Sequence, residues 1–466
     1  SVTDLEIASF GPRAALDRHY SSSRSGAANP GPGWVYSFER RVEASAQAAV
    51  YVDADGERHT FRALAGGGFR PEHGYRAELA TTPAGGFALT YRDGTTLQFS
   101  SDGSLASERD LRGNHVRYDI SEDVTITAAN GQTISVDRDA QGRVLEAVHV
   151  TGDGTRRVVY APGSVTAHPS TTDELTLDYA YAAGRLTSIA TRDEVEGLGT
   201  TATWTFGYDP CGRPEEASAW AGQSSPSYLT FFAHGTGEAT VTVLRDVDPA
   251  THSARLSQDT VARYEWHPTG ASARRSVFRH VDDEGRLRAP FTYWAWTYTP
   301  DNDVRSEKTP LGARTTYLHD ARGNVIETID AAGGVSTTVW EADRPVTETD
   351  PTGAVTTRRY LATGEVDYEE RTLDEGGARS RVEYSYDARG LLIEEHVLFE
   401  ARHQVATSLG ALLRTIREAG FTPVQRTTLY EPLRRYDAPH EEETGVMPAM
   451  VRRERVAPAL GDCHAD

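Results

Sequence analysis

Polar and apolar residues alternate in short runs along the chain, most regularly between residues 314 and 395. Runs such as 324–329 and 355–360 are rich in Thr, Val, Ile and Tyr, which favours strands with one face in water. Clusters with Asp, Gly or Pro separate the runs, as at 330–334 and 350–353. Because Asp can accept a nearby backbone N–H and Gly can adopt a positive φ, these clusters predict tight turns.

The strands and turns return as one repeated phrase: an aromatic residue, a polar cluster with Gly, and a β-branched run. The phrase occupies residues 317–326, 340–346, 360–366 and 386–393. Its aromatic residues lie 23, 20 and 26 positions apart. Because a single hairpin cannot bury its apolar face, this period predicts a β-repeat array in which each unit packs mainly on the next.

Several copies of the phrase match Tyr-Asp-x-x-Gly or a close variant of it. The residues expected to shape these repeat turns are Tyr208, Asp209, Gly212, Tyr317, Asp320, Gly323, Tyr386, Asp387 and Gly390. Copies without the Tyr lie at 139–145 and 281–287. On these residues the chain resembles the YD-repeat (Rhs-repeat) proteins, a family related to bacterial Rhs toxins, insecticidal toxin-complex shells and teneurins.

The resemblance implies a fold that is mainly β. In that family a YD-repeat hairpin array forms a spiralling sheet or partial hollow shell. Bacterial members use the shell to enclose a payload, and the teneurins use their repeats for adhesion. Family shells are usually built from a much longer chain, so whether this chain closes a shell alone is left open.

Three regions are expected along the chain. Residues 1–120 resemble the N-terminal β module that precedes the repeats in Rhs proteins, and residues 121–398 are expected to hold the YD repeats. Residues 399–466 are expected to form a helix plus an irregular tail. The apolar spacing over 403–419 predicts that one short C-terminal helix, and Gly420 is placed to end it.

The resemblance of the N-terminal region rests on four phrases in a fixed order. They lie at residues 16–23, 31–39, 51–61 and 103–118. In the second phrase Trp34, Tyr36 and Phe38 occupy alternate positions, which predicts one apolar strand face able to seal the first edge of the sheet.

Composition narrows the classes of function. The 48 basic and 68 acidic residues give a net charge of −20, which argues against nucleic acid or an anionic membrane surface as the partner. No apolar run approaches the roughly 18 residues that span a bilayer, so no membrane-spanning segment is expected. The N-terminus shows no signal peptide, so export uses other machinery or a leader outside this numbering. By resemblance, we expect a bacterial protein that is secreted or at the cell surface.

The sequence contains no nucleophile elbow, metalloprotease helix or phosphate-binding loop, so no catalytic, cofactor-binding or metal residues are expected. Residues 53–56 and 301–303 offer carboxylates to calcium but lack the later Glu of an EF-hand, which favours turn roles instead. Asp350 and Pro351 lie inside a repeat, without the context of the self-cleaving Rhs core. Cys211 and Cys463 form no disulfide framework or metal set, and their pairing is left open.

Residues 291–298 form the most aromatic predicted strand of the chain. In it, Trp294 and Trp296 share one face with Tyr298 and could stack on sugars, which makes them candidate glycan contacts. The competing interpretation, aromatic packing within a thin sheet, is favoured because aromatic side chains dominate core energetics.

Three hypotheses about function follow. The first is a non-enzymatic scaffold, part of an Rhs-type β-shell around a polypeptide payload or against a neighbouring protein subunit. The second is a cell-surface adhesion or carbohydrate-binding repeat protein. The third places a small enzymatic effector domain in residues 400–466, although about 66 residues with one helix hardly build such a core unaided.

Overall fold

The computed structural model is almost entirely β-sheet, so the predicted fold class is confirmed. Its one described helical element is a 3-10 turn, η1 (Ser37–Glu39). The predicted helix at 403–419 lies outside the described residues. The structure describes residues 1–22, 24, 28–65, 68–72, 75–169, 171, 174–193, 199–220, 228–245, 260–267, 271–278, 292–372, 379–400 and 426–429.

Two small antiparallel sheets come first in the chain. The first comprises β1 (Val2–Ile7), β2 (Ala14–Tyr20) and β3 (Trp34–Tyr36). The second comprises β4 (Arg41–Ala44), β5 (Ala48–Val52), β6 (Arg58–Ala63) and β7 (Phe69–Pro71). Within the part of the chain that is described, no helix combines the length and the apolar composition that crossing a membrane requires.

All later strands belong to one large antiparallel sheet in which each strand pairs with its neighbours in sequence. The strands are β8 (Ala77–Thr81), β9 (Phe87–Tyr91), β10 (Thr96–Phe99), β11 (Leu105–Arg109), β12 (His115–Ile120), β13 (Val124–Thr127), β14 (Thr133–Arg138), β15 (Val144–Thr151), β16 (Gly154–Ala161), β17 (Ser164–Ala167), β18 (Leu175–Ala182), β19 (Arg185–Asp193), β20 (Gly199–Tyr208), β21 (Pro214–Trp220), β22 (Tyr228–Gly235), β23 (Glu238–Arg245), β24 (Thr260–Trp266), β25 (Ser272–Phe278), β26 (Thr292–Tyr298), β27 (Val304–Lys308), β28 (Arg314–His319), β29 (Val325–Ile329), β30 (Val335–Glu341), β31 (Arg344–Thr349), β32 (Val355–Tyr360), β33 (Val366–Thr372), β34 (Arg379–Tyr386), β35 (Leu392–Glu400) and β36 (Arg426–Leu429).

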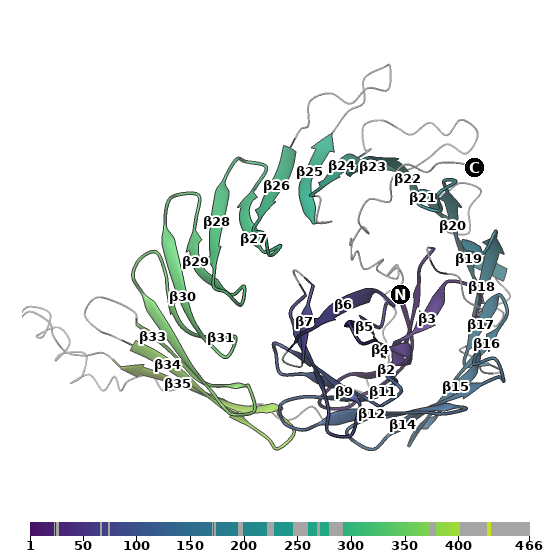
Figure 1. Cartoon of the computed structure of the whole chain (residues 1–466), viewed down its shortest axis with the longest axis horizontal. Helices are drawn as coiled ribbons and strands as arrows, with labels where there is room; N and C mark the ends of the chain where they lie inside the picture. Colours follow the sequence, from purple (N-terminus) through teal and green to yellow (C-terminus); the bar gives the residue numbers. More distant parts are fainter. Residues whose placement is uncertain are drawn as a thin grey trace, which may run out of the picture.

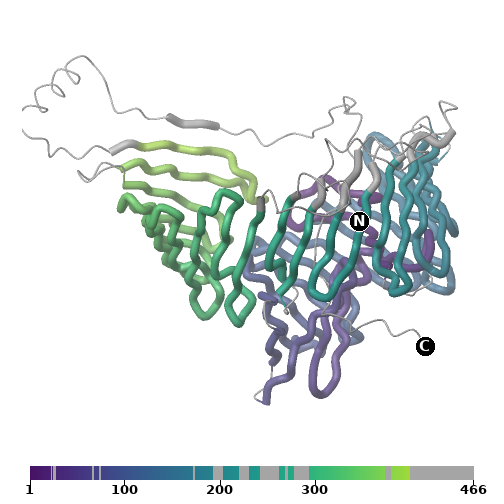
Figure 2. Tube along the Cα trace, turned by 90° about the horizontal axis from the view of Figure 1, so that it is seen from above, coloured from purple at the N-terminus to yellow at the C-terminus, as the bar shows by residue number. Residues whose placement is uncertain are grey.

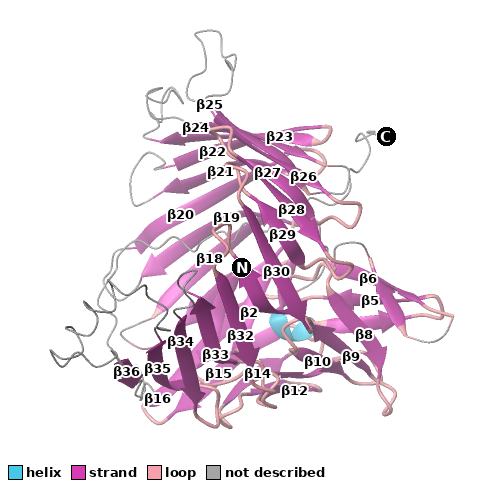
Figure 3. Ribbon diagram, turned by 90° about the vertical axis from the view of Figure 1, so that its left-hand side faces the viewer, coloured by secondary structure: helices cyan, strands magenta, loops and turns pink. Residues whose placement is uncertain are grey.

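The large sheet curls into an arc, and the two small sheets lie inside it (Figure 1). Seen from above, the teal and green hairpins stand side by side as a wall (Figure 2). Figure 3 shows the same strands in magenta beside the short η1 turn in cyan. The division into three regions stays a prediction, and β12 pairs directly with β13 across residue 120.

The hydrophobic core lies between the small sheets and the early strands of the arc. Trp34, Tyr36 and Phe38 are all buried in it, together with Leu89 and Ile126 from the large sheet. The predicted apolar face of residues 34–38 therefore packs against the concave side of the sheet. The same core encloses an ion pair, in which Arg18 Nε lies 2.8 Å from Asp4 Oδ2 and the guanidinium carbon lies 4.7 Å from the centre of the Trp34 ring.

Turns of the late hairpins meet turns of the early ones across the arc, at what we call the turn seam. Three arginines from the segments around β8–β12 make the side-chain contacts: Arg76 with Asp303, Arg92 with Asn324 (3.2 Å) and Arg112 with Glu365 (2.5 Å). Arg112 also donates to the backbone carbonyl of Asp387 at 3.3 Å. The seam joins residues more than two hundred positions apart, without strand pairing between them.

Candidate functional site

The repeat turns share one arrangement of hydrogen bonds. At residues 320–324, Asp320 Oδ1 accepts the N–H groups of Arg322 and Asn324 at 2.8 and 2.9 Å. The Gly323 N–H donates to the Asp320 carbonyl at 3.0 Å, and Gly323 has a φ of 80°, which favours glycine. Burial opposes ionisation of Asp320, but these hydrogen bonds bring its pKa below the ordinary value.

The other two predicted turns have the same geometry. Asp387 Oδ1 accepts the N–H groups of Arg389 and Leu391 at 2.9 Å each, and the hydrogen bond from Leu391 is the main cause of the lowered pKa of Asp387. At residues 209–213, Asp209 Oδ1 accepts the Arg213 N–H at 2.9 Å, while Arg213 Nε donates to Oδ2 at 2.7 Å. The predicted glycines, Gly212 and Gly390, both have positive φ, 80° and 94°.

The aromatic residue of the repeat ties one turn to the preceding turn on the same edge. Its polar atom donates to a backbone carbonyl at the start of the neighbouring strand. The pairs are Tyr208 with Leu186 (2.8 Å), Tyr298 with Ser272 (2.6 Å), Trp340 with Val325 (2.7 Å), Tyr360 with Pro345 (2.9 Å) and Tyr386 with Val366 (2.9 Å). For Tyr317, no such bond is found within the described residues.

The strand pairing shows which residues lie on the concave face of the sheet. Residues opposite each other in an antiparallel pair lie on the same face, and alternate residues along a strand return to that face. Buried Tyr179 on β18 marks the core side, and following the pairs leads through Trp204 and Val241 to buried Tyr264. The next pairs lead from Tyr264 through Arg275 to Trp294.

This face, which we call the inner face, continues through β27 to β35 without changing sides. All the aromatic residues that bond back to a carbonyl share its side of their strands. On β30 the alternation is visible in exposure: Val335, Thr337 and Val339 are exposed, whereas Ser336 and Trp340 are half-buried. The outer face is therefore the more solvent-accessible one on this strand.

The two candidate glycan contacts, Trp294 and Trp296, both lie on the inner face and are half-buried. The Arg275 guanidinium lies 5.1 Å from the centre of the Trp294 ring. Their neighbour Tyr293 points to the outer face, where Lys308 Nζ donates to its hydroxyl at 2.6 Å. The glycan contact stays a prediction.

The inner face becomes polar and charged on the late strands. Arg358 on β32 lies between two carboxylates, 2.5 Å from Glu348 on β31 and 2.6 Å from Glu369 on β33. Its side chain is 21% exposed, whereas the inner-face residues Leu89 and Ile126 of the early strands are fully buried. The inner face at Arg358 is thus more accessible to solvent than the inner face of the early strands.

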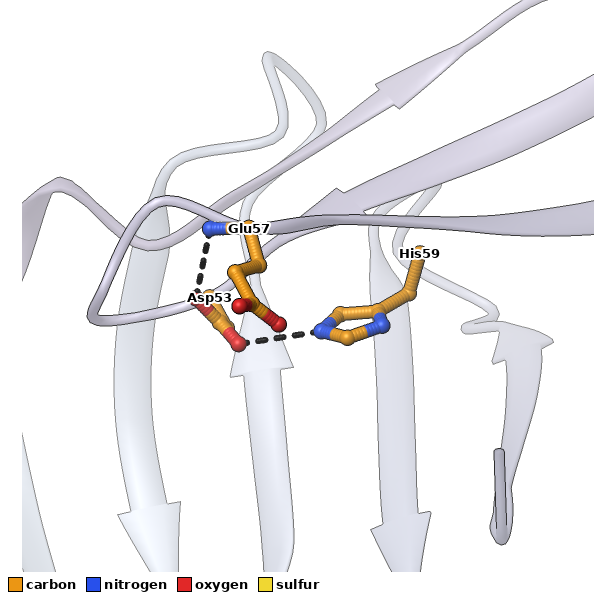
Figure 4. Close-up of side chains that lie close together, drawn as sticks. All are labelled: Asp53, Glu57 and His59. Carbon is orange, nitrogen blue, oxygen red and sulfur yellow. Dashed lines mark hydrogen bonds and ion pairs between the residues drawn. The ribbon is translucent and has the colours of Figure 1, made fainter. Parts of the chain in front are cut away.

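The two candidate calcium turns have different environments. Asp303 is engaged by Arg76 at the turn seam. In the β5–β6 turn, Asp53 lies close to two residues that the sequence analysis did not single out, Glu57 and His59 (Figure 4). The ligand atoms of these three residues all lie within 4.8 Å of one another. One feature of the sequence indicates the cluster: His59 lies two positions after Glu57, on β6, the strand that follows the turn.

Two family models match parts of the chain: a domain of unknown function, DUF6531, at residues 1–61, and the RHS Repeat at residues 298–335. The tRNA3(Ser)-specific nuclease WapA of Bacillus spizizenii is 34% identical over 100 residues, 22% of this chain and 4% of that protein. The 5-amino-6-(D-ribitylamino)uracil–L-tyrosine 4-hydroxyphenyl transferase of Methanopyrus kandleri is 50% identical over 52 residues, 11% of this chain and 14% of that enzyme.

Among solved structures, the Photorhabdus luminescens Tc holotoxin pore is 11% identical with a TM-score of 0.40, over 84% of this chain and 23% of that one. TcdB2–TccC3 without its hypervariable C-terminal region is 10% identical with the same TM-score, over 77% of this chain and 22% of that one. The matches thus span less than a quarter of each of these proteins. The RHS repeat matched at residues 298–335 lies where the repeated phrase and its turns are found. The predicted resemblance to the Rhs-repeat (YD-repeat) proteins is therefore confirmed at residues 298–335.

Proposed function

We propose that this chain is a non-enzymatic structural scaffold, part of a β-shell that encloses or presents a secreted, toxin-like polypeptide. The observation that carries the proposal is the inner face, which keeps one side of the sheet turned inward from β8 to β35. A wall with one continuous inner face supports a role in bounding an interior space. In this proposal the partner is a polypeptide payload or a neighbouring protein subunit.

The use of the repeated polar residues supports a structural role. In the turn at 209–213, Asp209 has both carboxylate oxygens occupied by Arg213. The hydroxyl of Tyr208 is likewise used on a backbone carbonyl of the neighbouring strand. The residues that define the repeat thus serve the wall itself, because their polar atoms are already bound to neighbouring parts of the same sheet.

The late part of the inner face supports contact with a polypeptide. It combines Tyr and Trp rings with Thr, Glu and Arg side chains that are half-exposed, as on β30 and β32. Aromatic rings offer contact area to apolar side chains, and the charged groups can bind the polar backbone and side chains of an extended chain. By analogy with the toxins among its relatives, we place the protein outside the bacterial cell or at its surface.

The test is a comparison of masses on the natively purified particle. Native mass spectrometry gives the mass of the assembly, and denaturing intact-mass analysis gives the mass of each polypeptide in it. We expect a second, noncovalently retained polypeptide that survives protease treatment of the native particle and is digested after unfolding. A single chain with nothing retained contradicts the proposal.

The same preparation tests the carbohydrate-binding alternative. That alternative predicts binding to glycans that weakens in Trp294→Ala or Trp296→Ala. Because both rings lie on the inner face and Arg275 lies beside Trp294, we expect no binding across a broad glycan panel. Strong binding that depends on either tryptophan would favour adhesion over enclosure.

A further inference from the structure

We propose that the β5–β6 turn is a binding site for a divalent transition-metal ion, held by Asp53, Glu57 and His59. All three side chains come from one seven-residue segment and converge on one side of the turn (Figure 4). Nε2 of His59 lies 2.9 Å from Asp53 Oδ2, and the Glu57 carboxylate approaches both. One imidazole nitrogen and two carboxylates are a ligand set that first-row transition metals accept.

Comparison with the repeat turns shows what is unusual about this turn. Asp53 Oδ1 accepts the Glu57 N–H at 2.8 Å, and Gly56 has a φ of 73°, the same Asp-x-x-Gly geometry found at Asp139 and Asp209. In those two turns the fifth residue is an arginine, Arg143 or Arg213, and its guanidinium binds the second carboxylate oxygen.

At the position of that arginine, the β5–β6 turn has Glu57. The substitution replaces a cation by a second carboxylate beside Asp53, and Asp55 adds a third acidic residue to the same turn. Among the described residues, no hydrogen bond or ion pair to the Glu57 carboxylate is found. The Arg24 guanidinium lies against Gly56 and its charge acts on Asp53, but no bond from it to Glu57 is found among the described residues. A bound cation would supply, at the Glu57 carboxylate, the positive charge that the arginine supplies in the repeat turns.

The histidine is held in place before any ion binds. His59 is buried, and its ring stacks between Tyr75, at 4.1 Å between centroids, and Tyr51, at 5.9 Å. Asp53 is fixed by its own backbone contacts, so two of the three ligands need little rearrangement. A site organised in this way loses less entropy on binding than one made of free surface side chains.

The position of the turn gives the ion a structural role. Asp55 Oδ1 lies 3.1 Å from Nδ1 of His19 on β2, so the turn of the second small sheet meets the first small sheet here. An ion held by residues 53–59 would stiffen this junction inside the arc. We therefore expect binding to stabilise the folded chain, because a ligand that binds the folded form alone raises its stability.

The test is isothermal titration of the full chain with Zn²⁺, alone and in the variants Glu57→Gln and His59→Gln. Acidic surface groups bind ions weakly, so the quantity compared is the tightest binding event. We expect the parent chain to bind one Zn²⁺ ion tightly. Each variant should weaken that affinity by more than the roughly 10–100-fold that loss of an outer-shell partner costs. Thermal unfolding with and without Zn²⁺ reports the same event independently of the titration heat.

A matched control is Asp139→Asn, which removes a carboxylate from a turn of the same geometry in which Arg143 occupies the second oxygen. It should leave the tight event and the thermal shift unchanged. Equal Zn²⁺ binding by the parent chain and both site variants would overturn the proposal. A preference for Ca²⁺ or Mg²⁺ over Zn²⁺ would overturn the metal class, since those ions favour sets of oxygen ligands.

Discussion

The aspartates of the repeat turns each act as a cap for the backbone. One carboxylate oxygen accepts N–H groups that would otherwise point out of the turn, and the second oxygen accepts from a side chain such as Asn324 or Arg213. An isolated surface ion pair contributes little to stability, but a carboxylate bonded to backbone N–H groups fixes the chain direction at each reversal. The repeat therefore depends on Asp for geometry more than for charge.

We expect different outcomes for two substitutions of Asp320. Asp320→Ala removes the acceptor for Arg322 and Asn324 and should lower the free energy of unfolding by roughly 1 kcal/mol, the usual size of such a loss. Asp320→Asn keeps one acceptor oxygen and should cost less. Urea unfolding of both variants, with hydrogen exchange of the Arg322 and Asn324 amides, measures the effect. Equal destabilisation by Ala and Asn would show that charge, not acceptor geometry, is what matters.

At the scale of the element, the aromatic side chain joins hairpins that the strand ladder already holds. Tyr360→Phe removes the hydroxyl that donates to the Pro345 carbonyl at 2.9 Å and leaves the ring in place. We expect the free energy of unfolding to fall by about 0.5–1.5 kcal/mol, because one hydrogen bond is lost while the strand pairing around Pro345 is kept. The control is Tyr317→Phe at the same position of another repeat, and chemical denaturation compares the two. A larger effect at Tyr317 would contradict the assignment.

Each residue of a strand points either to the inner or to the outer face of the sheet, and this is a second property of the element. Neighbouring residues Ser336 and Thr337 on β30 point to opposite sides, the first to the inner face. If the sheet is the wall of a shell, Ser336→Cys should react more slowly than Thr337→Cys with a bulky maleimide polymer. A small maleimide should reduce the difference, and unfolding should abolish it. Equal native rates with the bulky reagent would show that both faces are open.

The hairpins and turns were predictable from the sequence because their signals are local. Asp320 and Gly323 lie three positions apart and close their turn without help from distant residues. The inner face was not predictable, since Trp294 is assigned to it by a succession of strand pairs that begins at Tyr179. The three-residue cluster at the β5–β6 turn is only partly predictable. The sequence indicates Asp53 as a turn residue, but the approach of His59 to Asp53 depends on the packing of the His59 ring between two tyrosine rings.

At the scale of the whole molecule, the turn seam is what holds the curled sheet to its own beginning. Its acceptors follow the repeat, with Asp303, Asn324, Glu365 and Asp387 lying 21, 41 and 22 positions apart. Three arginines of the early segments therefore contact late turns at the spacing of the repeat, with one repeat passed over between Asn324 and Glu365. Because these contacts are side-chain bonds between turns, the seam can open without breaking any strand pair.

The seam should be sensitive to salt and acid. Burial raises the pKa of Glu365, but the hydrogen bond and charge of Arg112 outweigh it and leave the pKa below its ordinary value. A lowered folded pKa means that the contact is fully present above the unfolded pKa of about 4.3 and is lost as the pH falls through the folded value. We expect the radius of gyration, measured by small-angle scattering, to rise below about pH 4 while the circular dichroism of the strands is kept.

A charge reversal separates the seam from general acid unfolding. Arg112→Glu places a carboxylate against Glu365 and removes the donor to the Asp387 carbonyl, so the seam should open at neutral pH. Charge-assisted hydrogen bonds contribute roughly 1.5–3 kcal/mol each, so hydrogen exchange in residues 361–391 should accelerate by about tenfold or more. Arg117→Glu, the same charge change at an exposed position on β12, should leave the exchange unchanged. If both variants behave alike, net charge rather than the Arg112 contact governs the curl, and the seam is not the closure of the sheet.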